Sequence, residues 1–180
     1  MTKLENKFIE ASRQGDFKIV KECIKQNVNI NVKTYLKETA LLWASIKKHF
    51  KVLKLLIENG ADVDVKNHWG DTPLLWASFN GGLEIVKLLI INGADINVKN
   101  NNGQTVLSES STQKNTKIFN YLVPLMYDCK QFEQIYNELE IEQKHILFKH
   151  FLNNEELLKQ VNISKMKGFI KDINKYKGIL

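Results

Sequence analysis

Apolar residues recur at helical spacing in pairs of short segments that are separated by polar residues and glycine. Thr72 is a typical N-cap, and Pro73 suits the first helical position because its missing N–H is not needed there. A short helix is therefore expected to run from Pro73 to about Phe79. Residues 83–91 are apolar at helical spacing and predict a second, antiparallel helix. Gly93 suits the left-handed residue that follows such a helix.

The same pattern repeats along the chain with an offset of 33 residues. The clearest matches pair 39–45 with 72–78, and 55–63 with 88–96. A third copy lies upstream, and a fourth begins at Gly103 and weakens after Ile118. Self-similarity at a fixed period of this length is typical of repeat architectures. We expect units at about 3–33, 34–66, 67–99 and 100–125.

Each unit is predicted to contain two helices and a protruding turn. One such unit cannot bury its apolar face alone, whereas stacked units share a continuous core. The predicted fold is therefore an all-α solenoid over residues 1–125, with a small helical C-terminal segment over 126–180. Two roles remain open for that segment. We favour a cap on the end of the array over a separate docking module.

The motifs of the third unit resemble those of the ankyrin repeat. The T-P-L-L-W-A stretch from Thr72 is similar to the family's T-P-L-H-x-A, and a G-A-D stretch follows from Gly93. This resemblance, which extends to small ankyrin-repeat proteins of host-associated microbes, covers roughly residues 3–123. It implies a non-enzymatic protein, with helix pairs, β-turn fingers and a concave surface that binds other proteins.

The chain departs from the family pattern at two kinds of position. Leu42 and Leu75 stand where the family usually has histidine, which predicts apolar packing in place of a polar network. Lys37 stands where the next two units have Gly70 and Gly103. A left-handed residue other than glycine costs about 1–2 kcal/mol, so we expect the turn at Lys37 to be distorted.

Composition favours a folded, binding protein over other classes. Apolar residues make up 43% and charged residues 26% of the chain, which argues against disorder. The formal net charge is +6, and lysines cluster in two places. Binding of nucleic acid or an anionic membrane through these lysines is therefore the alternative function. Arg13 is the only arginine, which weakens this alternative because arginine is the preferred ligand of phosphates and bases. The lysines are Lys47, Lys48, Lys51 and Lys54, and then Lys165, Lys167, Lys171, Lys175 and Lys177.

No arrangement of residues predicts catalysis, a metal site or a cofactor. Glu142 and His145 have helical spacing, but such a pair is far more often a surface feature. Cys23 and Cys129 match no metal-binding spacing, and Cys23 is expected to be a buried, unreactive thiol. No signal peptide is recognisable at the start of the sequence, and no apolar run approaches about 18 residues. We therefore expect a monomer in the cytoplasm, or one delivered to a host cytoplasm.

Aromatic residues carry the prediction of a binding site. Trp43 and Trp76 share one repeat position, and we favour their stacking on each other in the core over a role at an interface. Trp69 lies on a turn tip and Phe79 near the end of a first helix, where exposed aromatics indicate an interface. The predicted partner-binding residues are Tyr35, Leu36, Glu38, Ile46, His68, Trp69, Asp71, Phe79, Asn80, Asn101, Asn102, Gln104 and Gln113.

Overall fold

A computed structural model describes residues 1–110 and 115–125 of the chain. The chain divides into two compact parts, an N-terminal part, Met1–Ser110, and a C-terminal part, Ser111–Leu180. The C-terminal part is described only over residues 115–125, which contain helix α8 (Thr116–Leu125). The predicted C-terminal helical segment lies outside the described residues, and its boundary near residue 125 stays a prediction.

The N-terminal part is built from pairs of short helices. The predicted helices 73–79 and 83–91 are confirmed at both ends. Over residues 1–110 and 115–125 the backbone contains no strand, only an isolated bridge between Lys99 and Thr105. The helices of the N-terminal part are α1 (Lys3–Gln14), α2 (Phe17–Lys25), α3 (Ala40–Ile46), α4 (Phe50–Glu58), α5 (Pro73–Phe79), α6 (Leu83–Ile91) and α7 (Val106–Ser110).

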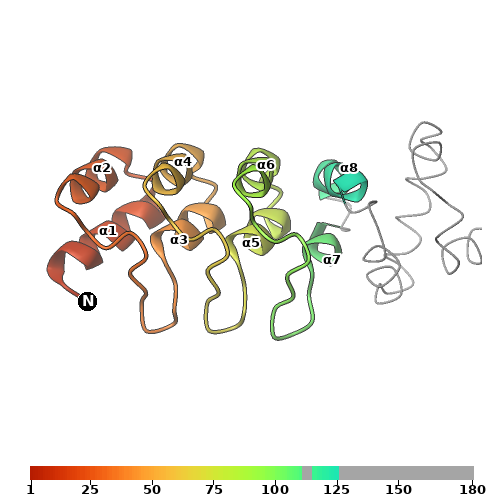
Figure 1. Cartoon of the computed structure of the whole chain (residues 1–180), viewed down its shortest axis with the longest axis horizontal. Helices are drawn as coiled ribbons and strands as arrows, with labels where there is room; N and C mark the ends of the chain where they lie inside the picture. Colours follow the sequence, from red (N-terminus) through yellow and green to blue (C-terminus); the bar gives the residue numbers. More distant parts are fainter. Residues whose placement is uncertain (111–114, 126–180) are drawn as a thin grey trace, which may run out of the picture. The chain divides into compact units, whose positions relative to one another are not determined.

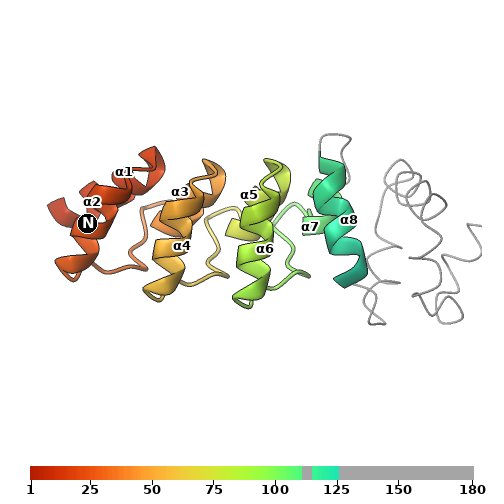
Figure 2. The ribbon, with the colours of Figure 1, turned by 90° about the horizontal axis from the view of Figure 1, so that it is seen from above.

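The helices of the N-terminal part form two layers (Figure 1). In one layer α1 contacts α3, α3 contacts α5, and α5 contacts α7. In the other layer α2 contacts α4, and α4 contacts α6, so that these three lie side by side (Figure 2). Within three pairs the two helices also pack on each other, α1 on α2, α3 on α4, and α5 on α6. The predicted all-α repeat architecture is therefore confirmed.

Local capping explains where the first helices begin. The Thr72 hydroxyl accepts a hydrogen bond from the backbone N–H of Leu75 at 3.3 Å, and Pro73 occupies the first turn. Thr39 caps α3 in the same way, through the N–H of Leu42. A threonine oxygen satisfies one of the donors that a helix N-terminus leaves unpaired. The N-cap predicted at Thr72 is thus confirmed.

The core lies between the two helix layers and between successive units. Leu74 and Ala77 are fully buried, as predicted. Leu42 and Leu75, which replace the family's usual histidine, are also buried, so apolar packing does replace a polar network at these positions. One buried hydrogen bond joins neighbouring units: the Ser45 hydroxyl donates to the Pro73 carbonyl at 2.6 Å.

Three turns project from the layer that contains α1, α3 and α5 (Figure 1). We call residues 34–38, 67–71 and 100–104 the fingers. In the second finger the Asn67 side-chain oxygen accepts hydrogen bonds from the N–H groups of Trp69 and Asp71, both at 2.9 Å. Asn100 closes the third finger in the same way. Asparagine favours turns because its side chain bonds to nearby backbone in this manner.

The prediction of a distorted first finger is wrong. Lys37 has a φ of 60°, close to the 78° of Gly70 at the same repeat position. Its N–H donates to the Thr34 carbonyl at 2.9 Å, which is the bond that also closes the other fingers. The Lys37 side chain is exposed and therefore meets no obstacle. The cost of a left-handed lysine, about 1–2 kcal/mol, is too small to overcome the hydrogen bonds that fix this turn.

Candidate functional site

Backbone hydrogen bonds hold the fingers in a row. The N–H of His68 donates to the Leu36 carbonyl at 2.9 Å, and the N–H of Asn101 donates to the Trp69 carbonyl at 3.0 Å. The Asn101 side chain adds a bond to the His68 carbonyl at 3.2 Å. The first finger is therefore supported by the second, and the second by the third. We call the surface made by the fingers and the exposed sides of α3, α5 and α7 the finger face.

Large aromatic side chains are exposed on the finger face. Tyr35 is 98% exposed at the first finger, Trp69 is 47% exposed at the second, and Phe79 is 55% exposed at the end of α5. Exposed aromatic groups that lie close together are typical of interaction surfaces. The exposure predicted for Trp69 and Phe79 is confirmed, whereas their role in binding stays a prediction.

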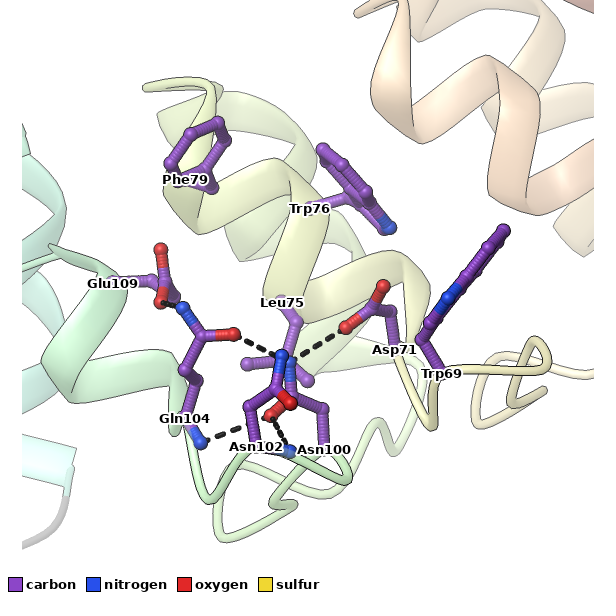
Figure 3. Close-up of a pocket in the computed structure, with 9 residues that line it drawn as sticks. All are labelled: Trp69, Asp71, Leu75, Trp76, Phe79, Asn100, Asn102, Gln104 and Glu109. Atoms are coloured by element: carbon purple, nitrogen blue, oxygen red, sulfur yellow. Dashed lines mark hydrogen bonds between the residues drawn. The ribbon is translucent and has the colours of Figure 1, made fainter.

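A pocket of about 220 Å³ opens on the finger face between the second and third fingers, α5 and α7 (Figure 3). Aromatic side chains supply part of its wall, and carboxylate and amide groups supply the rest. All of its lining residues belong to the N-terminal part, Met1–Ser110. The pocket is lined by Trp69, Asp71, Leu75, Trp76, Phe79, Asn100, Asn102, Gln104 and Glu109.

Hydrogen bonds connect the polar side of this pocket. The Asn100 amide donates to Asp71 Oδ1 at 2.7 Å and to Gln104 Oε1 at 2.8 Å. The Gln104 amide in turn donates to Glu109 Oε1 at 2.7 Å (Figure 3). This chain of bonds runs from the second finger to α7. It fixes the positions of two carboxylates without neutralising either one.

Glu109 is electrostatically unfavourable in its position. Burial raises the pKa of the Glu109 carboxyl above its ordinary value, and the negative charge of Asp71 raises it further. The hydrogen bond from Gln104 opposes these two effects. Neither Asp71 nor Glu109 has an ion pair with a lysine or arginine in the ranges 1–110 and 115–125. The pocket therefore carries negative charge that no described cation offsets.

The favoured prediction for the two tryptophans is wrong. Trp43 and Trp76 do not stack on each other in the core, and both are only half-buried. The Trp76 ring meets Phe79 edge to face, with the ring centres 5.8 Å apart. The Trp43 ring instead lies beneath Arg13, whose guanidinium carbon is 4.7 Å from the ring centre. Phe79 reaches Trp76 because it lies three residues further along the same helix, and Arg13 reaches Trp43 because α1 packs on α3.

The pocket brings together part of the predicted site. Trp69, Asp71, Phe79, Asn102 and Gln104 all line it. The other predicted residues that the structure describes lie elsewhere on or near the finger face, and several serve the fold. Leu36 and Ile46 are half-buried and accept hydrogen bonds from the third unit through their carbonyls. Outside the pocket lie Tyr35, Leu36, Glu38, Ile46, His68, Asn80 and Asn101, while Gln113 lies outside the described residues.

The sequence interpretation missed Glu109 as a site residue. Its signal is the repeat itself, because Glu109 stands 33 positions after Trp76 and 66 after Trp43. The family position that carries an aromatic ring in the second and third units therefore carries a carboxylate in the fourth. Aligning the units by position, rather than by similarity of residue type, would have placed Glu109 beside the exposed aromatics.

Among the described residues, the other reactive or charged side chains do not assemble into a second site. Cys23 is fully buried in α2, and burial raises the pKa of its thiol, as expected for an unreactive cysteine. Two of the four clustered lysines have partners: Lys48 donates to the Asn80 carbonyl at 3.2 Å, and Lys54 pairs with Glu58 at 3.9 Å. The described part of the chain has no cluster of three or more acidic, histidine or cysteine side chains that could hold a metal. Among these residues no helix has the length and apolar character needed to cross a membrane.

Comparison with known proteins gives one family. The family described as ankyrin repeats (3 copies) matches residues 8–100 and 67–134. No curated protein matches the chain. Ankyrin repeats are generally protein–protein interaction modules. The matched residues, the helix pairs with their capping threonines, and the row of fingers agree with one another, and the chain belongs to the ankyrin-repeat family.

Proposed function

We propose that this protein is a non-enzymatic module that binds a protein partner on its finger face. Trp69 and Phe79 are its main contacts, and His68, Asp71 and Asn80 form the polar surround. The observation that carries the proposal is that two exposed aromatics line one pocket, although they come from a finger and from a helix. Interface energy concentrates in a few aromatic residues of this kind.

The finer form of the proposal is an adaptor directed at a host protein. It rests on the resemblance to ankyrin-repeat proteins of host-associated microbes, and it places the working protein in a cytoplasm. It requires that the partner be found among host proteins rather than among those of the source organism. The experiment that tests the general proposal therefore uses both kinds of lysate.

Site-specific photo-cross-linking tests where a partner lies. A photoreactive phenylalanine analogue at position 79 should give protein adducts, because this side chain is exposed on the finger face. The matched control places the analogue at position 91, since Ile91 is 80% exposed on α6, in the other helix layer. Adducts at position 91 but not at 79 would move the binding surface to the opposite layer and contradict the proposal.

Once a partner is isolated, Trp69→Ala tests the main contact. The substitution should weaken binding by about 1–2 kcal/mol, measured by calorimetry, because it removes a large ring from the pocket wall. Thermal stability should stay nearly unchanged, since Trp69 is 47% exposed. Ile91→Ala is the matched control and should leave affinity unchanged.

The charge-driven alternative makes a different prediction. If the lysines bound phosphate groups, the adducts would contain nucleic acid or lipid. Affinity would also fall steeply as salt concentration rises, because phosphate binding releases counterions. A Trp69→Ala protein would then bind as well as the parent chain, and the finger face would not be the functional surface.

A further inference from the structure

The chain already shows how a tryptophan at this repeat position can be used. Trp43 carries the guanidinium of Arg13 over its ring, at 4.7 Å from the ring centre. This distance is within the range of cation–π attraction, in which the negative face of the ring binds a cation. Arg13 comes from α1, the first helix of the preceding unit, so the contact joins two units.

Trp76 holds the same position one unit later, but no arginine of the chain can serve it. Arg13 is the only arginine in the sequence, and it is already at Trp43. The residue 33 positions after Arg13 is Ile46, which carries no charge. Among the described residues, Trp76 therefore has the aromatic half of the arrangement without a cation over its ring.

The surroundings of Trp76 supply what a cation needs in addition to a ring. Asp71 and Glu109 line the same pocket as Trp76, and hydrogen bonds through Asn100 and Gln104 keep both carboxylates in place. Neither carboxylate is paired with a lysine or arginine in the described part of the chain. A cation placed between them would offset the burial of Glu109 and its repulsion by Asp71.

We propose that this pocket receives an arginine side chain of the protein partner, held between the aromatic rings of Trp76 and Phe79 and the carboxylates of Asp71 and Glu109. The inference rests on the proposed function, because the arginine belongs to a bound protein. Arginine fits better than lysine for two reasons. Its planar guanidinium stacks on aromatic rings, and its fixed fork of donors pairs with carboxylates.

The test uses the isotope-labelled full chain and a short capped peptide in which one arginine is flanked by glycines. The readout is the indole N–H resonance of each tryptophan. Those of Trp69 and Trp76 should shift, because both side chains line the pocket. The Trp43 resonance should not move, since its ring is already covered by Arg13. The peptide is titrated to about 20 mM, because a single side chain in an open pocket binds with millimolar affinity.

Two controls separate a specific site from general attraction. A peptide in which neutral citrulline replaces arginine keeps the shape and loses the charge, so it should give no shift. In the protein, Glu109→Gln should weaken arginine binding by about three- to tenfold. Glu84→Gln removes a carboxylate on α6 that pairs with Lys87 and does not line the pocket, and it should change nothing. An unchanged Trp43 resonance in each variant shows that the first units remain folded.

Three results would overturn the proposal: no shift at the highest peptide concentration, equal shifts with citrulline, or full binding by the Glu109→Gln protein. These results leave the proposed function untouched, because cross-linking at position 79 detects a protein partner whatever side chain it presents. Conversely, cross-links only from position 91 would remove the protein partner from this face even if the peptide bound.

Discussion

Three repeat positions hold the backbone in the left-handed region, each of them in three units, and at each position one of the three residues is not glycine. Left-handed φ is nearly free for glycine and costs other residues about 1–2 kcal/mol. The three exceptions therefore mark places where the fold is less stable than its repeat allows. The sets are Gly15, Lys48 and Gly81 after the first helices, Asn27, Gly60 and Gly93 after the second helices, and Lys37, Gly70 and Gly103 in the fingers.

Replacing Lys37 with glycine should stabilise the protein. The substitution removes the left-handed penalty, while the greater freedom of glycine in the unfolded chain returns about 0.4–1 kcal/mol of it. The expected net gain is about 0.5–1 kcal/mol, measured by urea unfolding. The matched control is Gly70→Ala, which should destabilise because its Cβ would lie 2.6 Å from Asn101 Oδ1. A loss of stability in Lys37→Gly would show that the lysine side chain supports the finger.

Glu109 is a residue at which binding and stability should oppose each other. Its pKa is raised in the folded protein by burial and by Asp71, so the folded state holds the proton more tightly than the unfolded state. The contribution of Glu109 to the free energy of unfolding is therefore present at low pH. It is lost as pH rises from the pKa of about 4.3 in the unfolded chain through the raised pKa in the folded protein. Glu109→Gln abolishes this loss.

The expected result is a higher melting temperature for Glu109→Gln than for the parent chain at about pH 7, with the difference shrinking below about pH 4. Melting curves over this pH range measure it. Glu84→Gln serves as the control because it breaks the ion pair with Lys87, and it should lower the melting temperature slightly or not at all. If Glu109→Gln melts earlier than the parent chain at neutral pH, the hydrogen bond from Gln104 outweighs the burial of the charge.

At the scale of the helices, stability depends on the side chains between neighbouring units. Leu74 lies on α5, which contacts α3, α6 and α7, and it is fully buried. Leu74→Ala should cost about 2–5 kcal/mol, since it removes apolar contact and leaves a cavity. Chemical unfolding measures the change, with Ile91→Ala as the exposed control. A cost no larger than that of the control would mean that Leu74 does not face the core.

The helices were predictable because their signals are local. Thr72 and Pro73 specify a helix start whatever surrounds them, and the apolar spacing of 83–91 specifies the buried side. The finger at Lys37 was mispredicted because a hydrogen bond from His68, in the next unit, helps to fix it. Local propensity could not include that bond.

The pocket was predictable only in part, for the same kind of reason. Trp69 and Phe79 could be selected because each stands alone at an exposed repeat position. Their meeting with Glu109 depends on how far the third and fourth units are displaced from each other, and no single segment encodes that displacement. The contact of Arg13 with the Trp43 ring likewise depends on the packing of α1 on α3. The contact between Trp76 and Phe79 lies within one helix, at a spacing of three residues, and was open to prediction.

At the scale of the whole molecule, the helices of residues 1–110 make extended contacts only with their neighbours. In the N-terminal part α1 touches α3, and α3 touches α5, but α1 has no extended contact with α5, nor α3 with α7. Stability in such an array is approximately the sum of the repeats and their interfaces. An end of the array has one interface fewer, so a segment that covered this end would add to stability.

Ending the chain after Leu125 tests the predicted cap. Repeat arrays need a polar or covered outer face at each end, and residues 126–180 are predicted from sequence to be a helical segment that supplies it. The shortened chain should therefore melt at a lower temperature and aggregate more readily than the full chain, as measured by thermal unfolding and light scattering. Cross-linking at position 79 should persist below the new melting temperature, because the pocket residues 69–109 are retained. A shortened chain that is as stable and as soluble as the full one would show that residues 126–180 do not cap the array. They would then form an independent module, and a second binding function would have to be sought there.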